Sequence, residues 1–145
     1  MIKLAIGCDH AAYEEKQKVI EFLRKKDYQV IDLGTDSIKS VDYPKFAHSV
    51  SKMVASNAAD KGILLCGSGI GISIAANKVK GIRAALCTSP EHAMMSRKHN
   101  DANILALGAR LTEFSEIESI VKTWLETPFA GGRHQIRVEK IEKYE

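Results

Sequence analysis

The chain has 145 residues, enough for one domain with a sizeable hydrophobic core. Its net charge of +3, carried by dispersed Lys and Arg, argues against a nucleic-acid-binding protein. No apolar run approaches the roughly 20 residues of a membrane-spanning helix, and the strand-like start of the chain is not typical of a signal peptide. Three cysteines without framework spacing indicate free thiols, so we expect a cytoplasmic protein. From the charge and the length of the apolar runs we expect neither a nucleic-acid nor a membrane partner.

Apolar runs alternate with amphipathic segments along the whole chain, without a linker or an internal repeat. In chain order we predict strand 2–8, helix 11–26, strand 28–33, helix 44–57, strand 61–66, helix 70–79, strand 81–87, helix 90–98, strand 103–107, helix 113–126 and helix 131–143. Alternation of this kind is typical of a parallel sheet covered on both faces. We therefore expect one α/β domain over residues 1–145, a three-layer α/β/α sandwich with a five-stranded parallel sheet, Rossmann-like in type.

Ligands bind such sheets at the carboxyl ends of the strands. Four segments follow predicted strands and are expected at that edge: Asp9-His10, residues 66–71, Thr88-Ser89 and Gly108-Ala109-Arg110. His99 and Asn100 instead follow a predicted helix and precede a strand, which places them at the opposite edge. If they are functional they serve the site of a neighbouring subunit, so their position predicts an oligomer.

The most informative segment is residues 66–71, where Gly67, Gly69 and Gly71 separate a buried strand from a helix. A glycine turn that leads into a helix forms a nest of backbone N–H groups, which binds an anion. The chain has no Gly-x4-Gly-Lys-Ser/Thr run of a Walker loop. A dinucleotide fingerprint would need Gly or Ala at position 72, which is Ile. The nest is therefore expected to bind something smaller than a dinucleotide.

Cys66 lies at the lip of this nest, where a helix N-terminus favours a thiolate, and we predict a reactive group there. The alternative is a small buried hydrophobic residue at a strand end. Cys8 and Cys87 also end strands, and we interpret both as packing residues.

Two arginines close to the C-terminus are candidates for phosphate binding. Arg133 and Arg137 are four residues apart and share one face of the last predicted helix, where two guanidinium groups could clamp a phosphate. The alternative is a solvated basic face. Asp9 could cap a helix, contact a ligand or do both, and His10 could contact a hydroxyl or phosphate, cap a helix or face solvent. No cluster has zinc-like spacing, so no metal site is expected.

Several motifs occur together in one family. They are Gly-Cys-Asp-His at 7–10, Asp-Tyr-Pro at 42–44, Cys-Gly-Ser-Gly-Ile-Gly-Ile-Ser-Ile-Ala-Ala-Asn-Lys at 66–78, Gly-Ile-Arg-Ala-Ala at 81–85, Ser-Arg-Lys-His-Asn-Asp-Ala-Asn at 96–103 and Gly-Gly-Arg-His-Gln-Ile-Arg at 131–137. With these motifs the whole chain closely resembles the type B ribose-5-phosphate isomerases, whose family also holds galactose-6-phosphate and allose-6-phosphate isomerases.

The resemblance implies a homodimer, sometimes paired into a tetramer, with sites at the subunit interface and the helix at about 131–143 close to it. It implies interconversion of D-ribose 5-phosphate and D-ribulose 5-phosphate, a step of the pentose phosphate pathway, through an enediolate without metal or other cofactor. By resemblance Cys66 is the catalytic base, assisted by the Ser68 hydroxyl, and His99 opens the sugar ring. The implied substrate contacts are Asp9, His10, Gly67, Ser68, Gly69, Ile70, Gly71, Asn100, Arg110, Arg133 and Arg137. Some relatives use a glutamate base at the position of Ile72, so this chain is of the cysteine type.

Two other readings stay open from the sequence. The substrate could be allose 6-phosphate or galactose 6-phosphate, since one added carbon is a small change in shape. The chain could also be a non-catalytic module that senses a sugar phosphate or a flavin, because doubly wound sheets host many functions. A sensor would need the nest and the arginines but no base, so Cys66 and His99 distinguish the two. A thiol redox enzyme is less favoured, because the chain has no Cys-x-x-Cys pair.

Overall fold

The computed structural model describes residues 1–144 and contains one five-stranded sheet. Every paired strand is parallel to its neighbour, and the strand order is β2-β1-β3-β5-β4. The strands are β1 (Lys3–Cys8), β2 (Gln29–Asp32), β3 (Lys61–Cys66), β4 (Ala84–Leu86) and β5 (Ile104–Gly108). The predicted five-stranded parallel α/β architecture is confirmed.

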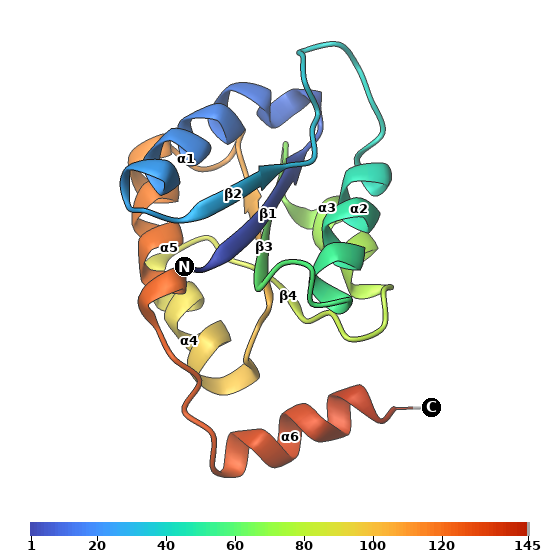
Figure 1. The fold of residues 1–145 in the computed structure, drawn as a ribbon, viewed down its shortest axis with the longest axis vertical. Helices are drawn as coiled ribbons and strands as arrows, with labels where there is room; N and C mark the ends of the chain where they lie inside the picture. Colours follow the sequence, from blue (N-terminus) through green and yellow to red (C-terminus); the bar gives the residue numbers. More distant parts are fainter. Residues whose placement is uncertain (145) are drawn as a thin grey trace.

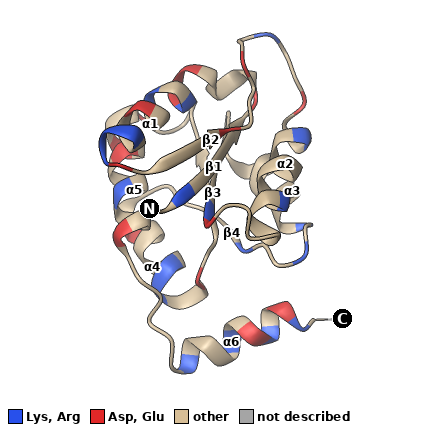
Figure 2. Cartoon of the chain, viewed as in Figure 1, with Lys and Arg blue, Asp and Glu red and all other residues tan. Residues whose placement is uncertain are grey.

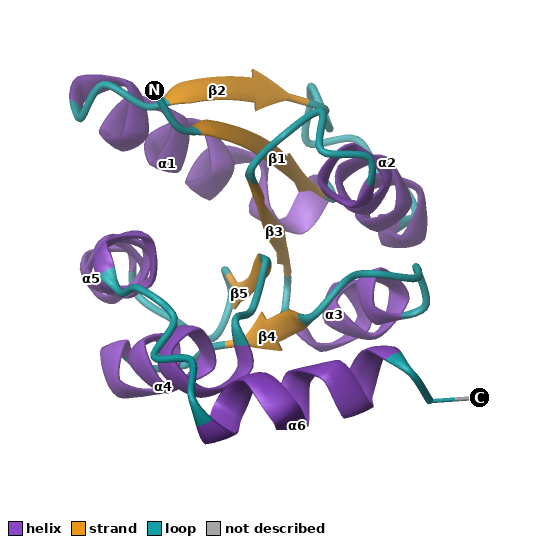
Figure 3. Ribbon diagram, turned by 60° about the horizontal axis from the view of Figure 1, so that its bottom comes forward, coloured by secondary structure: helices purple, strands orange, loops and turns teal. Residues whose placement is uncertain are grey.

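Helices cover both faces of the sheet (Figures 1 and 3). They are α1 (Tyr13–Lys25), α2 (Tyr43–Ala55), α3 (Ile70–Asn77), α4 (Pro90–Asn100), α5 (Phe114–Glu126) and α6 (Arg133–Glu142), with a short 3₁₀ helix η1 (His10–Ala12) before α1. Residues of α1, α4 and α5 share one buried cluster with the strands, and residues of α2 and α3 share another. Helix α6 lies outside these layers, against α4.

The burial of the central strand β3 on both faces explains its apolar run from Ile63 to Cys66. Ile63, Leu64 and Leu65 are each 0% exposed. Ile63 and Leu65 belong to the cluster under α1, α4 and α5, whereas Leu64 and Cys66 belong to the cluster under α2 and α3. Because alternate side chains point to opposite faces, a strand covered on both faces must be apolar at every position. Each such side chain contributes about 1.5–3 kcal/mol on burial.

Several predicted boundaries differ from the structure for local reasons. The predicted strand 81–87 is reduced to β4, since Gly81 has a φ of 87° and belongs to a turn. The last helix begins at Arg133 rather than at 131, because Gly131 and Gly132 adopt φ values of 67° and 58°. Helix α4 extends two residues beyond its predicted end, so His99 and Asn100 lie in its last turn rather than after it.

Lys16 lies on the buried face of α1 with Val19, Ile20 and Leu23, and it is itself buried at 1% exposure. Its Nζ atom lies 2.6 Å from Asp32 Oδ1 at the end of β2, so the buried charge is paired. Otherwise the charges of both signs lie mostly on helices and loops (Figure 2). Within residues 1–144, every helix is too short or too polar to cross a bilayer.

Candidate active site

A cavity of about 550 Å³ opens at the carboxyl edge of the sheet. It is lined by Asp9, Tyr43, Cys66, Gly67, Ser68, Ile70, Gly71, Arg110 and Leu111. The ends of β1, β3 and β5 therefore bring together most of the residues expected at this edge. A neighbouring cavity of about 350 Å³ includes Ser68 and Thr88, the residue two positions beyond the end of β4.

The loop between β3 and α3 has its glycines where side chains would not fit. Gly69 has a φ of 79°, and a Cβ atom there would lie 2.8 Å from the carbonyl carbon of Leu107. A Cβ atom on Gly71 would lie 2.5 Å from the ring of Tyr43. Gly69 permits the left-handed turn that starts α3, and Gly71 leaves room for the tyrosine beside the loop.

Cys66 ends β3 in the wall of the cavity and is 5% exposed. Its sulfur accepts a hydrogen bond from the Gly69 amide at 3.1 Å, at the N-terminus of α3. The amide of Gly71, in the first turn of α3, has no acceptor within that helix. A sulfur beside a helix N-terminus is placed where negative charge is favoured.

The Ser68 hydroxyl is expected to assist Cys66, and the structure gives it a different partner. Its oxygen accepts a hydrogen bond from the Ile70 amide at 3.2 Å. Among the hydrogen bonds within residues 1–144, none joins Ser68 to the cysteine. Ser68 nevertheless lines the cavity, so its hydroxyl remains available to a ligand.

The other two thiols lie in a different environment. Burial raises the pKa of Cys8 to about 12 and that of Cys87 to about 11. Both side chains are buried in the cluster under α1, α4 and α5, and neither lines the cavity. They remain neutral at ordinary pH, which fits the packing role expected for them.

Asp9 both caps a helix and lines the cavity. Its Oδ1 atom accepts a hydrogen bond from the Ala11 amide at 3.0 Å, which supports η1, and the residue also forms part of the cavity wall. His10 is adjacent in the chain but is not among the lining residues. Its Nδ1 atom accepts a hydrogen bond from the Val41 amide at 3.1 Å and so holds the loop that precedes α2.

Arg110 reaches the cavity from the loop after β5. Its amide donates to the Gly67 carbonyl at 2.9 Å, and the Ala109 amide donates to the Cys66 carbonyl at 2.9 Å. The side chain runs past Gly67, where an added Cβ atom would lie 3.4 Å from Arg110 Cδ. The loop after β5 is thus tied to the nest, and the guanidinium is exposed at its mouth.

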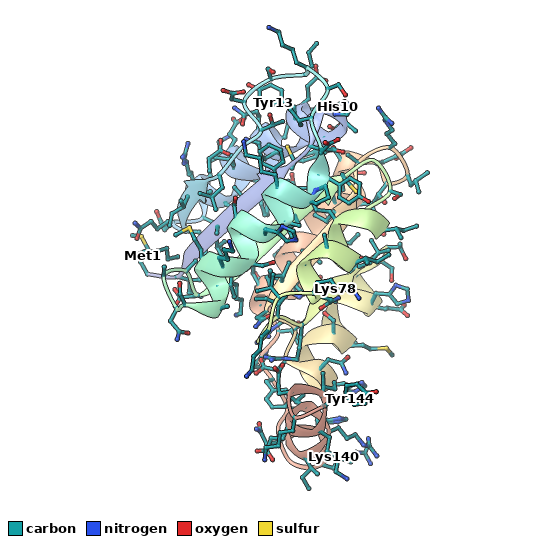
Figure 4. The ribbon with its side chains drawn as sticks, turned by 90° about the vertical axis from the view of Figure 1, so that its right-hand side faces the viewer. Met1, His10, Tyr13, Lys78, Lys140 and Tyr144 are labelled. Atoms are coloured by element: carbon teal, nitrogen blue, oxygen red, sulfur yellow. The ribbon has the colours of Figure 1, made fainter. Side chains whose placement is uncertain are left out.

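The remaining candidate residues lie at the other end of the molecule. His99 and Asn100 end α4, and Arg133 and Arg137 lie on α6. Figure 4 shows His10 at one end and Lys140 of α6 at the opposite end. For His99 and Asn100 this separation from the carboxyl edge agrees with the position predicted from the sequence, whereas the location of Arg133 and Arg137 was not predicted.

Two residues near these candidates, Tyr43 and His134, were given no role in the sequence analysis. Tyr43 lines the cavity at the start of α2, although Asp42-Tyr43-Pro44 was noted only as a motif. His134 stacks on His99, with ring centroids 4.4 Å apart and an interplanar angle of 17°. Desolvation and the neighbouring charges of His99, Arg133 and Arg137 lower the pKa of His134. The stack depends on how α6 packs on α4, which no local motif encodes.

Within residues 1–144, no group of three or more His, Cys, Asp or Glu side chains is arranged to hold a metal ion. The features that the structure does bring together are a thiol, a glycine loop at a helix N-terminus and an arginine around one cavity. On this fold they define an α/β enzyme whose site holds a small anionic substrate.

Comparison with known proteins narrows this class. The chain belongs to the ribose/galactose isomerase family, which it matches over residues 4–141. It is 48% identical to ribose-5-phosphate isomerase B of Escherichia coli over 141 residues, covering 97% of this chain and 95% of that protein.

Solved structures agree with this assignment. The ribose-5-phosphate isomerase B of Clostridium thermocellum superposes with a TM-score of 0.97 at 54% identity, covering 98% of this chain and 96% of that one. The Mycoplasma genitalium enzyme, solved with bound ribulose-5-phosphate, has a TM-score of 0.95 at 42% identity, covering 99% and 95% of the two chains. The resemblance seen in the sequence is confirmed, and the chain is an aldose–ketose isomerase.

Proposed function

We propose that the protein interconverts D-ribose 5-phosphate and D-ribulose 5-phosphate through an enediolate, with Cys66 as the base. The observation that carries this proposal is the position of the Cys66 sulfur, in the wall of the cavity and hydrogen-bonded to the Gly69 amide. The relatives named for this reaction, at 42–54% identity over nearly the whole chain, support the same substrate. In cells this is a step of the pentose phosphate pathway.

In the proposed reaction the Cys66 thiolate removes the proton from C2 of the open-chain aldose. The electron pair moves toward C1 and its oxygen, which gives an enediolate. The resulting thiol then returns the proton to C1, and a proton moves between the two oxygens, so that the ketose forms with no net change in atoms or electrons. Within residues 67–71 the Gly69 and Ile70 amides are bonded to the Cys66 sulfur and the Ser68 hydroxyl, so the other N–H groups of the loop, that of Gly71 among them, stabilise the oxyanion. One such donor is worth about 3 kcal/mol in other enzymes.

Substrate binding at this edge is assigned to Asp9, His10 and Arg110. Asp9 and Arg110 line the cavity with the loop. His10 does not line it, and its proposed contact requires the loop before α2 to adjust around the ligand. The cavity volume of about 550 Å³ is large enough for a five-carbon or a six-carbon sugar phosphate.

We further propose that the active protein is a homodimer whose sites lie at the subunit interface. His99 as the ring-opening group, Asn100 as a substrate contact and Arg133 and Arg137 as phosphate ligands lie at the end of the chain remote from its own Cys66. They can reach a substrate bound at Cys66 only if a second copy supplies them. Two such dimers could pair into a tetramer.

The proposed location is the cytoplasm. All three cysteines are free thiols, as expected for a reducing compartment.

The first test follows conversion of ribose 5-phosphate to ribulose 5-phosphate by the purified protein in the presence of EDTA, for wild type beside Cys66→Ala. We expect wild-type turnover that the substitution abolishes, with ribulose 5-phosphate binding retained. Turnover that survives Cys66→Ala would refute the base and leave the reaction intact. Wild-type inactivity on ribose 5-phosphate, with activity on allose 6-phosphate or galactose 6-phosphate, would correct the substrate.

A further inference from the structure

Helix α6 projects from the three layers (Figures 1 and 3). Side-chain and backbone contacts near each of its ends join it to the rest of the chain. Just before the helix, the Ala130 amide donates to the Lys98 carbonyl at 3.1 Å, and in its first turn His134 stacks on His99. Between its two ends, Val138 is the only residue of α6 that is buried. At its far end Ile141 lines a cavity beside Arg83, and the polar contact there is made by Glu142.

That contact is with Arg83, whose guanidinium pairs with the Glu142 carboxylate through Nη1. The Arg83 side chain is 17% exposed and that of Glu142 is 31% exposed, so the pair is partly shielded from water. The backbone of Arg83 is itself anchored. Its amide donates to Asn103 Oδ1 at 2.8 Å, and its carbonyl accepts from the Asn103 amide at 3.0 Å, next to the start of β5.

The same guanidinium also binds the end of α4. Its Nε atom donates to the Asn100 carbonyl at 3.0 Å, and its Nη2 atom donates to the Asp101 carbonyl at 2.9 Å. The last carbonyls of a helix have no intrahelical donors and carry the negative end of the helix dipole, so a cation is favoured there. The Arg83 guanidinium thus joins the α4 terminus to the end of α6, while the Arg83 backbone is bonded to Asn103 beside β5.

We propose that Arg83 is a positioning residue for phosphate binding: it holds α6 at a defined angle to the end of α4, so that Arg137 points consistently at the substrate. Arg137 lies between the two attachments of the helix, three residues after His134 and five before Glu142. Loss of the Arg83–Glu142 contact leaves α6 held by its first turn and by the buried Val138, without a polar contact at its far end, and lets Arg137 sample other directions. This assignment rests on the proposed phosphate-binding function of α6.

Glu142→Gln tests the assignment, because it weakens the contact and leaves the bonds of Arg83 to α4 in place. Glu139→Gln is the matched control on the same helix, since that carboxylate bonds only to Gln135 within the described residues. We expect Glu142→Gln to raise the KM for ribose 5-phosphate and the Ki of inorganic phosphate together, by about threefold to tenfold, with kcat changed less than about twofold. Glu139→Gln should leave all three constants unchanged.

The double variant adds a second criterion. If Glu142 acts through Arg83, then Arg83→Met combined with Glu142→Gln should have the same KM as Arg83→Met alone. Equal KM and Ki in Glu142→Gln and Glu139→Gln, with active wild type, would overturn the positioning role. A fall in kcat at constant KM would overturn it as well.

Hydrogen exchange of the α6 amides gives a readout that does not need turnover. We expect faster exchange in Glu142→Gln than in Glu139→Gln. Wild type that converts no sugar phosphate, together with this faster exchange, would refute the proposed function while the attachment by Arg83 stood. Equal exchange rates in the two variants would overturn the attachment itself.

Discussion

The Gly69 amide donates a hydrogen bond to the Cys66 sulfur at 3.1 Å, across the turn that joins β3 to α3. The bond requires Gly69 at a φ of 79°, so a glycine conformation aims an N–H group at the thiol. The proposed base and the proposed oxyanion-binding loop are therefore one structural unit. Perturbing the turn should affect catalysis through the thiol as well as through the donors.

Gly69→Ala tests this coupling. A Cβ atom at this position would lie 2.6 Å from the Leu86 side chain and 2.8 Å from the Leu107 backbone, in a backbone conformation that alanine rarely adopts. We expect a loss of about 2 kcal/mol or more in unfolding free energy and a fall of about 100-fold in kcat. Urea unfolding and steady-state kinetics measure the two effects.

Gly81→Ala is the matched control for that variant. Gly81 also has a positive φ, 87°, but an added Cβ atom would meet nothing within 4 Å. We expect a cost of about 1 kcal/mol with kcat and KM unchanged. Equal losses of activity in the two alanine variants would show that strain, rather than the turn at Cys66, explains the effect.

Alkylation should distinguish the three thiols. At pH 8 the pKa of about 11 leaves roughly one Cys87 side chain in a thousand as thiolate, and Cys8 has fewer still. Cys66 lies in the cavity wall, so we expect iodoacetamide to label it first and inorganic phosphate or substrate to slow the labelling. Peptide mass spectrometry identifies the labelled site. Earlier labelling of Cys8 or Cys87 would contradict this order.

The buried thiols also predict how stability depends on pH. A thiol whose pKa is raised from 9.0 to about 11 in the folded state stabilises fully below pH 9, and that contribution is lost as pH rises from about 9 to 11. At pH 10 the loss attributable to Cys87 is about 1.4 kcal/mol. Urea unfolding of wild type and Cys87→Ala at pH 7 and pH 10 measures it. The variant should lose less stability than wild type, and equal losses would contradict the prediction.

Subunit complementation tests the shared site. Cys66→Ala and His99→Asn should each reduce activity by about 100-fold or more. After the two are refolded together, half of the dimers are mixed and each mixed dimer has one intact site, so about a quarter of wild-type activity should return. Cys66→Ala refolded with Cys66→Ser is the control, because no intact site can form. No recovery in the first mixture, with mixed dimers shown by mass spectrometry, would refute the interface site.

The His99–His134 stack can be followed by NMR titration. The lowered pKa of His134 means that it stays neutral to a lower pH than an ordinary histidine. Desolvation is the main cause of the lowered pKa, followed by the charges of His99, Arg133 and Arg137. We expect His99→Ala to raise the pKa of His134 toward its usual value. A titration curve that does not shift would show that the stack is absent in solution.

Local sequence features determined much of the fold and of the loop at Cys66. The apolar run from Ile63 to Cys66 predicted a strand covered on both faces, and the burial of Ile63, Leu64 and Leu65 shows why these positions are apolar. Glycines at 67, 69 and 71 indicated a tight turn into a helix, since the conformation of a turn depends on the residues within it. The order of strands and helices then placed Cys66 and His99 at opposite edges.

Other features depended on packing between segments far apart in the chain, and only the tertiary structure decided them. Lys16 lies on the buried face of α1, and its partner Asp32 is set by the pairing of β2 with β1. The same holds for the stack of His134 on His99 and for the contact of Arg83 with Glu142. Apolar residues that recur every 3.6 or every two positions indicate whether a segment is a helix or a strand and which face it buries. The angle at which α6 meets α4 is determined instead by contacts between side chains more than 30 residues apart.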